Sequence, residues 1–348
     1  MNEKKKTMHA VIEIVIAVLV IIAVYFIIRG MDRHDAHIRQ EVTEKETQHI
    51  WKEFQEKTVT IKLQKETYRF AHPVQTYLFI GTDKSGNEDA EGEEYHGSMA
   101  DALMLVVVDE EEKAYGILQL NRDTITEVPM LLQDGSANAS AQMQLCTAHW
   151  YGKDKAASCD NTVETVSKML GGLPIDGYYA LKMDAMPLLN HEVGGVTVTL
   201  EDDMTKLDPA MKKGTTLTLT DRQAELLMQS RYAMDDDRNT QRMRRQQIFL
   251  NAFMKKIKKQ NAGDVNATVK LYDRLRPYAT TDIKMNDLTA LLKDMQGYTD
   301  KGIITIDGTS KIGEKLHDGK KHWEFYMDED SLETSMKQLY PLVQEKGK

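Results

Sequence analysis

An apolar segment near the N-terminus constrains this chain more than any other feature. From Ala10 to Ile28 nearly every residue is apolar, Glu13 is the one charged residue, and there is no Pro or Gly. A helix of about 20 such residues crosses the ~30 Å hydrocarbon layer of a membrane. Lys4–Lys6 precede the segment, and a basic flank stays on the cytoplasmic side. We therefore expect a single-pass protein of the cell membrane whose N-terminus lies inside.

A cleaved signal peptide is the alternative interpretation of this segment. Signal peptides carry a shorter apolar stretch, roughly 7–15 residues, followed by small residues at the cleavage site. Here the apolar stretch is longer and Arg29 follows it directly, which favours an uncleaved anchor. The predicted organisation is a cytoplasmic tail at 1–8, a transmembrane anchor at 9–29, an extracytoplasmic stalk at 30–72 and a globular domain at 73–348.

The part of the chain that follows the anchor is acidic. The net charge is −9, and residues 1–30 hold four Lys/Arg and two Asp/Glu, so residues 31–348 carry −9 − 2 = −11. Nucleic-acid affinity comes mainly from Lys and Arg that meet phosphates, so we expect no nucleic-acid partner. A ligand that carries phosphate must instead meet a local cluster of basic side chains.

Short apolar runs alternate with segments of helical periodicity after residue 75, which predicts an α/β fold. Strands are predicted at 59–63, 76–81, 102–108, 115–120, 178–182 and 196–200. Helices are predicted at 161–170, 184–191, 220–230, 240–259 and 331–342. Buried apolar strands interleaved with helices are typical of a sheet that helices cover on both faces.

Two aspartates stand at the ends of predicted strands. Asp83 follows the strand at 76–81, and Asp101 precedes the strand at 102–108. Open α/β sheets place their ligand sites at strand ends, and two carboxylates with phosphate oxygens and water suit Mg²⁺. The alternative is that each aspartate only caps a turn, as Asp readily does.

Basic side chains gather in two further segments. Arg122, next to Asp123, follows the strand at 115–120. The helix at 240–259 and the residues just before it add three arginines and a glutamine at one-turn spacing: Arg238, Arg242, Arg245 and Gln246. Such spacing puts side chains on one helix face, and guanidinium forks match phosphate oxygens. The alternative is a solvated basic face paired with Asp235–Asp237.

The sequence contains two cysteines, Cys146 and Cys159. An even count in an oxidising compartment permits a disulfide, and in chain-entropy models a bridge that closes so short a loop contributes roughly 3 kcal/mol. We expect the disulfide, with two buried thiols as the alternative.

The motifs and their order resemble the LytR-CpsA-Psr family of cell-envelope proteins. The resemblance covers residues 75–259 and rests on segments that read GTD, ADALMLVVVD, LQLNRDT, LPIDGYYALKMDAMPLLNHEVGGVTVTL and SRYAMDDDRNTQRMRRQQ. It implies a three-layer α/β/α domain with a central mixed sheet. It also implies an enzyme that transfers a glycopolymer from a polyprenyl pyrophosphate to peptidoglycan, with Mg²⁺ at the pyrophosphate and the prenyl chain in an apolar tunnel.

The resemblance also implies roles for individual residues. Asp83 and Asp101 match the metal-binding aspartates. The residues that match pyrophosphate ligands are Arg122, Arg231, Arg242 and Gln246. Arg122 and Asp123 are the candidate catalytic residues, with Asp123 as a weak candidate for the general base.

The sequence departs from the family pattern at three places, and each departure removes a positive charge. Gln229 stands where the first Arg of an R-x-R motif is common, Ser98 and Met99 stand where an Arg often precedes the second aspartate, and Gln144 stands where a Lys is common. These departures keep open a protein that binds or senses a polyprenyl pyrophosphate without turnover. A hydrolase that releases the polymer into water is a third possibility.

Overall fold

The computed structural model describes residues 59–88, 94–230, 238–260, 274–283 and 298–345. The expected transmembrane anchor at 9–29 lies outside these residues. Within the described ranges, no helix is long and apolar enough to cross a membrane.

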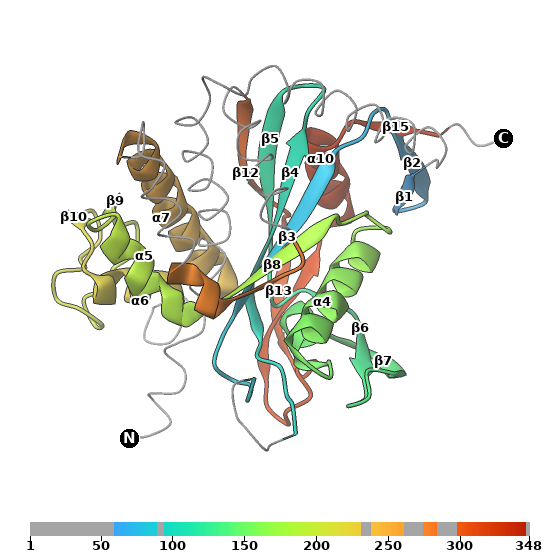
Figure 1. Cartoon of the computed structure of the whole chain (residues 1–348), viewed down its shortest axis with the longest axis horizontal. Coiled ribbons are helices and arrows are strands. Elements are labelled where there is room, and N and C mark those ends of the chain that lie inside the picture. Colours follow the sequence, from blue (N-terminus) through green and yellow to red (C-terminus); the bar gives the residue numbers. More distant parts are fainter. Residues whose placement is uncertain (1–58, 89–93, 231–237, 261–273, 284–297, 346–348) are drawn as a thin grey trace, which may run out of the picture.

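A six-stranded mixed sheet forms the centre of the domain (Figure 1). Its strands, in spatial order, are β11 (Ala279–Thr281), β8 (Gly177–Lys182), β3 (Gln75–Thr82), β4 (Ala100–Asp109), β5 (Ala114–Leu120) and β12 (Thr299–Thr305). β4 pairs antiparallel with both β3 and β5, whereas β3 pairs parallel with β8 and β5 parallel with β12. The expected central mixed sheet is therefore confirmed.

Helices cover both faces of this sheet, which gives three layers (Figure 1). One side carries α5 (Met186–Glu192), α6 (Asp221–Gln229) and α7 (Asn239–Gln260), and the other carries α4 (Lys155–Met169) and α10 (Glu329–Leu339). All ten residues of β4 are buried. Because both faces of the sheet are covered, its central strands are continuous apolar runs and not alternating ones.

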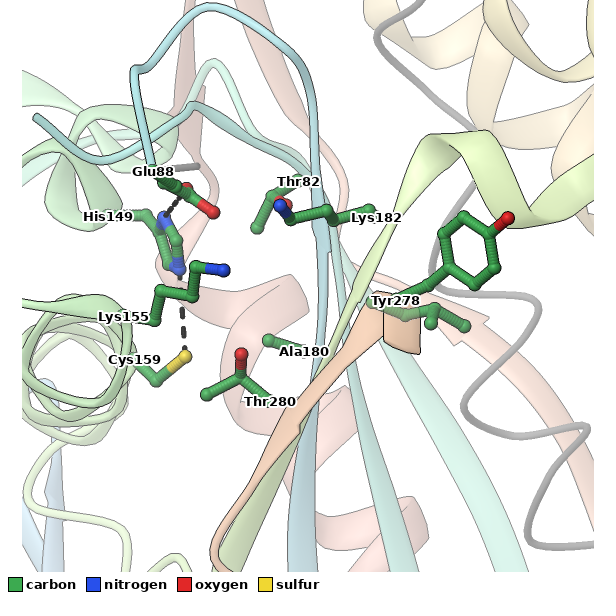
Figure 2. A pocket seen from close by; sticks show the side chains of 10 residues that line it. Thr82, Glu88, His149, Lys155, Cys159, Ala180, Lys182, Tyr278 and Thr280 are labelled. Atoms are coloured by element: carbon green, nitrogen blue, oxygen red, sulfur yellow. Dashed lines mark hydrogen bonds and ion pairs between the residues drawn. The ribbon is translucent and has the colours of Figure 1, made fainter. Parts of the chain in front are cut away.

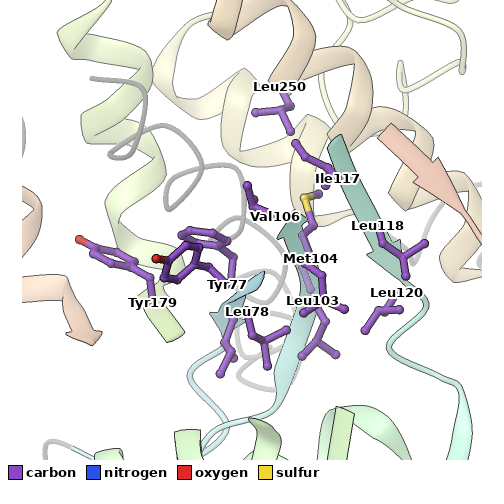
Figure 3. Packing of buried hydrophobic residues seen from close by; sticks show 14 of the residues in the cluster. Tyr77, Leu78, Leu103, Met104, Val106, Ile117, Leu118, Leu120, Tyr179 and Leu250 are labelled. Atoms are coloured by element: carbon purple, nitrogen blue, oxygen red, sulfur yellow. The ribbon is translucent and has the colours of Figure 1, made fainter. Parts of the chain in front are cut away.

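Successive side chains of each strand enter opposite layers. Figure 3 shows Met104 and Val106 of β4 on the side of Leu250 from α7, whereas Leu103 points away from it. Their partners on β5 follow the same alternation, with Ile117 opposite Val106. The apolar core therefore extends above and below the sheet.

The remaining strands form smaller sheets around this core. Their bounds are β1 (Thr60–Leu63), β2 (Glu66–Phe70), β6 (Ile125–Leu131), β7 (Ala137–Gln144), β9 (Thr197–Thr199), β10 (Thr216–Thr218), β13 (Gly308–Gly313), β14 (His322–Met327) and β15 (Leu342–Gln344). The strand predicted at 196–200 is β9, which pairs with β10 outside the central sheet. Three short 3-10 helices complete the described fold: η1 (Leu145–Trp150), η2 (Met183–Ala185) and η3 (Arg276–Tyr278).

The N-terminal boundary of the domain differs from the expected one. β1 and β2 fall inside the segment 30–72 that the sequence assigns to a stalk, and β2 pairs with both β1 and β15. Ile61, Leu63 and Tyr68 are buried in the main core. Residues 59–72 therefore belong to the globular domain, because their apolar side chains alternate inward along two paired strands.

Four strand ends meet at one edge of the central sheet. β3 and β8 run parallel and end in register, with Thr82 opposite Lys182. β4 begins at this edge with Ala100, opposite Thr82, and β5 ends there with Leu120 opposite Leu103. The segments at these ends carry Asp83, Asp101 and Arg122, so the fold brings these three expected ligands to one edge of the sheet.

Candidate functional site

A β-bulge places Asp101 at the start of β4. Gly81 pairs with Ala102 while the next residue, Thr82, pairs with Ala100, so Asp101 is an extra residue in the ladder. Bulges interrupt the pairing and re-aim a side chain, and they are frequent beside active sites. Asp101 is 1% exposed, which makes it a buried carboxylate at the sheet edge.

Arg122 and Arg242 converge on this carboxylate. Arg122 Nη1 donates a short hydrogen bond to Asp101 Oδ1. Arg242 Nη2 donates to the Asp101 carbonyl oxygen at 3.1 Å, and its Nη1 lies 3.7 Å from Asp101 Oδ2. The expected convergence of these two arginines with Asp101 is thus present, and both guanidinium groups are buried.

Asp101 Oδ2 is a buried oxygen that has no hydrogen-bond partner among the described residues. A buried carboxylate oxygen without a hydrogen bond carries a desolvation cost that a bound cation or donor would remove. A carboxylate oxygen is the kind of ligand that Mg²⁺ prefers, and this one also lies 3.7 Å from Arg242 Nη1.

Asp83 lies on the turn that follows β3. Its Oδ1 accepts hydrogen bonds from the Ser85 amide at 2.8 Å, the Ser85 hydroxyl at 2.5 Å and the Met99 amide at 2.9 Å. These bonds tie the turn after β3 to the segment before β4. Asp83 is only partly buried, so the turn-capping and the metal-binding interpretations are compatible, because Oδ1 holds the turn while the side chain stays partly exposed.

Arg122 sits among several electron-rich groups. Its Nη2 approaches Cys146 Sγ at 2.6 Å and Met99 Sδ at 2.8 Å, and its Nε is 3.4 Å from Asp123 Oδ1. Burial alone would lower the pKa of Arg122, but the Cys146 sulfur and the Asp123 carboxylate outweigh burial and raise that pKa. Arg122 therefore remains charged, and Asp123 is a buried neighbour of this guanidinium.

The first turns of α7 position Arg242 and Gln246. Arg242 Nε donates to Asn239 Oδ1 at 2.9 Å, and Asn239 Nδ2 donates to Asn121 Oδ1 at 2.8 Å. Gln246 Oε1 accepts from Gln119 Nε2 at 2.9 Å. These hydrogen bonds hold the start of α7 against the end of β5. Gln246 is buried there, with its side-chain oxygen on the sheet side.

The arginine face predicted on α7 is divided between two roles. Arg238 is exposed, whereas Arg245 is 1% exposed and holds the C-terminal end of α6. Arg245 Nε donates to the Leu227 carbonyl at 3.1 Å, Nη2 donates a short bond to the Ser230 carbonyl, and Nη1 donates to Asp202 Oδ2 at 2.6 Å. A solvated basic face is therefore wrong for Arg245. Arg231 and Asp235–Asp237 lie outside the described residues.

The expected disulfide between Cys146 and Cys159 is wrong, because both cysteines are buried thiols in the structure. The two sulfurs point to different partners. Cys146 Sγ lies beside Arg122, and Cys159 Sγ, on α4, lies 3.6 Å from His149 Nε2. The even cysteine count predicted a pair, but the fold gives each thiol its own polar environment.

Alkylation of the unfolded, unreduced protein is expected to label both cysteines. Buried thiols that are not joined become accessible once the chain unfolds, without any reductant. The protein is unfolded in denaturant and then treated with iodoacetamide. Mass spectrometry should find adducts on Cys146 and Cys159. Recovery of unlabelled protein that gains two adducts only after reduction would contradict this assignment.

The positions where family cations are replaced have separate local roles. Gln144 Nε2 donates to the Trp323 carbonyl at 2.5 Å, which ties β7 to β14. The Ser98 amide donates to Glu88 Oε1 at 2.8 Å, and Gln229 is the buried last residue of α6. The described part of the site therefore holds Arg122 and Arg242 as its central cations.

A pocket beside this site was missed by the sequence interpretation (Figure 2). It is small, with room for about one water molecule, and it opens between the ends of β3 and β8 and the start of α4. Its polar lining residues include Thr82, Glu88, His149, Lys155 and Lys182. The sequence feature that could have indicated this pocket is Lys182, a basic residue at the end of a predicted strand. The structure pairs that strand with the one that precedes Asp83.

Three potential metal ligands also meet at the opposite end of β4, where His72, Asp109 and Glu112 bring ligand atoms within 4.8 Å of one another. These groups are engaged with protein partners. His72 Nε2 bonds both oxygens of Asp109 at 2.9 Å, and Lys301 Nζ bonds Glu112 Oε2 at 3.0 Å. This cluster is distant from the strand ends that carry Asp83 and Asp101.

The fold and the site together define an α/β/α domain with two buried arginines and a buried aspartate at one sheet edge. The LytR_cpsA_psr family model matches residues 28–340. This chain belongs to the LytR-CpsA-Psr family. No protein with curated annotation matches the sequence.

Solved structures share this fold across most of their length. TagV from B. subtilis is 24% identical, with a TM-score of 0.55 over 76% of this chain and 95% of that chain. TagT bound to LIIa-WTA is 20% identical, with a TM-score of 0.55 over 76% and 91%. Protein gbs0355 from Streptococcus agalactiae is 20% identical, with a TM-score of 0.58 over 76% and 88%. At these identities the likeness concerns the fold.

Proposed function

We propose that this protein is a membrane-anchored phosphotransferase that moves a glycopolymer from a polyprenyl pyrophosphate carrier to peptidoglycan. The observation that carries the proposal is the convergence of Arg122 and Arg242 on the buried Asp101, at the edge where four strand ends meet. Membership of the LytR-CpsA-Psr family supports it, as does the TagT fold, which has been solved with LIIa-WTA bound.

The reaction would join an acceptor hydroxyl oxygen to the phosphorus next to the polymer. The phosphoanhydride bond to the carrier would break, polyprenyl phosphate would leave, and the hydroxyl proton would pass to a base. Phosphoryl transfer of this kind depends mainly on positioning and on neutralising charge. Arg122 and Arg242 would bind the phosphate oxygens, Gln246 would orient a neighbouring side chain, and Arg231 is proposed as a third cation.

Asp83 and Asp101 are the residues proposed to hold Mg²⁺. A bound magnesium ion would supply charge neutralisation at the pyrophosphate. Asp101 Oδ2, which accepts no hydrogen bond from the described residues, and the partly exposed carboxylate of Asp83 support this assignment. Asp123 stays the candidate base, although its burial beside Arg122 favours a role in keeping that guanidinium charged.

The apolar segment before residue 29 is proposed as the anchor that keeps the domain outside the cytoplasmic membrane. There the domain would meet both a lipid-linked donor and the peptidoglycan acceptor. Protease added to intact cells should then digest the domain. Complete protection of the domain, with cell integrity confirmed by a cytoplasmic marker, would exclude this topology.

Loss of the Arg242 fork is expected to weaken binding of a prenyl pyrophosphate by roughly ten- to hundredfold, since a hydrogen bond to a charged group contributes about 1.5–3 kcal/mol. Calorimetry with geranyl pyrophosphate and Mg²⁺ would compare Arg242→Lys and Arg242→Ala with the unchanged protein. Arg242→Lys keeps a positive charge opposite the buried Asp101 carboxylate. It therefore tests the two-pronged hydrogen bonding of the guanidinium separately from its charge.

Arg244→Ala is the matched control for this measurement. Arg244 lies on the same helix but is exposed. Substitution of an exposed side chain typically changes a free energy by less than ~0.5 kcal/mol. Equal losses in Arg242→Ala and Arg244→Ala would show a general basic face and not a site. Unchanged affinity in both Arg242 variants would exclude a pyrophosphate site at this position.

A protein that only binds or senses the lipid pyrophosphate is the second candidate. It is favoured by the replacement of cations at Met99, Gln144 and Gln229, because fewer positive charges would meet the developing charge of a transition state. Incubation with a lipid-linked polymer and peptidoglycan separates the functions. Transfer yields polymer joined to the wall, hydrolysis yields polymer in solution, and binding alone leaves the donor intact.

A further inference from the structure

We propose that Asn121 and Asn239 are positioning residues that couple Arg122 to Arg242. Their side-chain amides form a bridge between the end of β5 and the start of α7, and this bridge holds the two guanidinium groups at the spacing that a pyrophosphate requires. The inference rests on the proposed function and deepens it, because it identifies the side chains that set the geometry of the proposed phosphate-binding arginines.

Asn121 directly follows β5 and opens the turn that carries Arg122. Its main-chain carbonyl accepts from the Thr124 amide at 3.0 Å and from the Thr124 hydroxyl at 2.6 Å. Its side-chain Oδ1 accepts from the Asp123 amide at 3.0 Å, as asparagine side chains often do in turns. The carbonyl and the side chain of Asn121 therefore close the turn around Arg122 and fix where the Arg122 side chain leaves the backbone.

Asn239 is the first residue of α7 and holds Arg242, which lies about one turn further along the helix. Arg242 Nε donates to Asn239 Oδ1 at 2.9 Å, and Asn239 Nδ2 donates to Asn121 Oδ1 at 2.8 Å. Asn121 and Asn239 are 7% and 3% exposed, so water hardly competes for these bonds. The oxygen of Asn121 thus accepts one donor from its own turn and one from the helix, which matches the two lone pairs of an amide oxygen.

The orientation of both side-chain amides follows from their neighbours. The Asp123 amide can only donate, so it requires the oxygen of Asn121. Arg242 Nε can likewise only donate, so it requires the oxygen of Asn239. The nitrogen of Asn239 then faces the oxygen of Asn121, and all three hydrogen bonds are satisfied together. Neither an aspartate nor an aliphatic side chain could replace Asn239 in this bridge, because neither supplies a donor.

The bridge does not use the guanidinium nitrogens that contact Asp101. Those nitrogens are Nη1 of Arg122 and both Nη atoms of Arg242. In the proposed reaction phosphate oxygens replace Asp101 as partners of these nitrogens, so the aspartate no longer fixes the distance between the arginines. The bridge still fixes that distance, because it engages Arg242 through Nε and Arg122 through the turn of its backbone.

Each asparagine taken alone has an ordinary structural explanation. Asparagine is favoured in turns, as at Asn121, and it is favoured where helices begin, as at Asn239. Neither preference explains why the two side chains bond to each other from positions 118 residues apart in the sequence. That bond joins the segment of one proposed phosphate ligand to the segment of the other, which is the observation that indicates a positioning role.

The test is calorimetry on the full-length protein in detergent with Mg²⁺ and two probes, geranyl pyrophosphate and geranyl monophosphate. The pyrophosphate presents two phosphate groups to the two arginines and the monophosphate presents one, so the first probe depends on the spacing between the arginines. Asn121→Ala, Asn239→Ala and the double variant remove the bridge without changing any charge.

Asn190→Ala is the matched control. Asn190 is also a buried amide, and it lies in α5, outside the proposed site. Its Oδ1 accepts from the Val196 amide at 2.9 Å, and its Nδ2 donates to the Leu219 carbonyl at 2.9 Å. This variant therefore reports what the loss of buried asparagine hydrogen bonds does when no arginine is coupled through them.

Each single variant of the bridge is expected to weaken geranyl pyrophosphate binding by roughly tenfold and geranyl monophosphate binding by less than about threefold. The double variant should lose no more than the larger single loss, because the two amides act as one unit. Asn190→Ala should lower the unfolding temperature and leave both affinities unchanged. Equal losses for the two probes, or additive losses in the double variant, would overturn the inference.

A measurement without ligand separates this inference from the proposed function. Hydrogen exchange of the Arg242 Nε proton, followed by NMR and assigned by its absence from Arg242→Lys, should be at least about threefold faster in Asn121→Ala, because Asn239 then loses the partner that keeps its oxygen in place. Unchanged exchange, with pyrophosphate binding weakened in Arg242→Lys, would show that the coupling is wrong and leave the proposed function standing. Faster exchange, with pyrophosphate binding unchanged in Arg242→Lys, would show that the coupling is present and exclude the proposed pyrophosphate site.

Discussion

Asp83→Asn is expected to reduce glycopolymer transfer by about 100- to 1000-fold while the domain stays folded. Asparagine keeps the oxygen that accepts from Ser85 and Met99, so the turn after β3 is preserved. The substitution removes the negative charge that the proposed Mg²⁺ site needs, and the loss of one preorganised electrostatic contribution typically costs this much in rate. Transfer of polymer from a lipid-linked donor to peptidoglycan, at several Mg²⁺ concentrations, measures it.

Asp134→Asn is a closely matched control for this substitution. Asp134 makes the same kind of turn, since its Oδ1 accepts from the Ser136 amide at 2.8 Å and from the Ser136 hydroxyl at 2.6 Å. It is exposed on the loop between β6 and β7. Transfer should be unchanged in this variant. Activity that remained normal in Asp83→Asn would place the metal elsewhere and reduce Asp83 to a turn residue.

Arg245→Ala is expected to lower the free energy of unfolding by about 3–4 kcal/mol. The change would leave the carbonyl groups of Leu227 and Ser230 without their donor and Asp202 without its cation. Removing one partner from a buried charged network usually carries a cost of this size. Thermal or urea unfolding of the protein, followed by circular dichroism, measures the difference.

Arg244→Ala, one residue away on the exposed side of α7, should change the free energy of unfolding by less than ~0.5 kcal/mol. The two arginines are neighbours on the same helix and differ in burial and in the hydrogen bonds that burial allows. Similar stability of both variants would show that the buried contacts of Arg245 contribute little. A stable Arg245→Ala protein that had lost pyrophosphate binding would instead return Arg245 to the ligand site.

The sequence was sufficient to predict the central strands and the residues that gather at their ends. β3, β4, β5 and β8 are long enough and apolar enough to be recognised as buried strands. Their alternation with helices predicted a covered α/β sheet, and the structure confirms it. Asp101, Arg122 and Arg242 are indeed adjacent, although they come from three separate segments.

Other features depend on contacts that no local pattern contains. The bulge at Asp101 requires the register between β3 and β4. Arg245 has the same spacing as a ligand arginine, and only the position of α6 makes it structural. Cysteine count could not show that Cys146 would approach Arg122 and Cys159 would approach His149. Lys155 is far from Lys182 in the sequence, so their shared pocket followed only from the packing of α4.

The hydrogen bonds of α7 determine which movements its layer can make. Its first turns are bonded to the sheet edge through Asn239 and Gln246, and a slide of one residue, about 1.5 Å along the axis, would break these bonds. Near its other end, Lys256 donates to the Gly194 carbonyl at 3.0 Å, in the loop after α5. The first turns of α7 are thus bonded to the sheet, and the last turns are bonded to the loop after α5. Because Arg242 lies between Asn239 and Gln246 on the same helix, the bonds that prevent such a slide also keep Arg242 opposite Asp101.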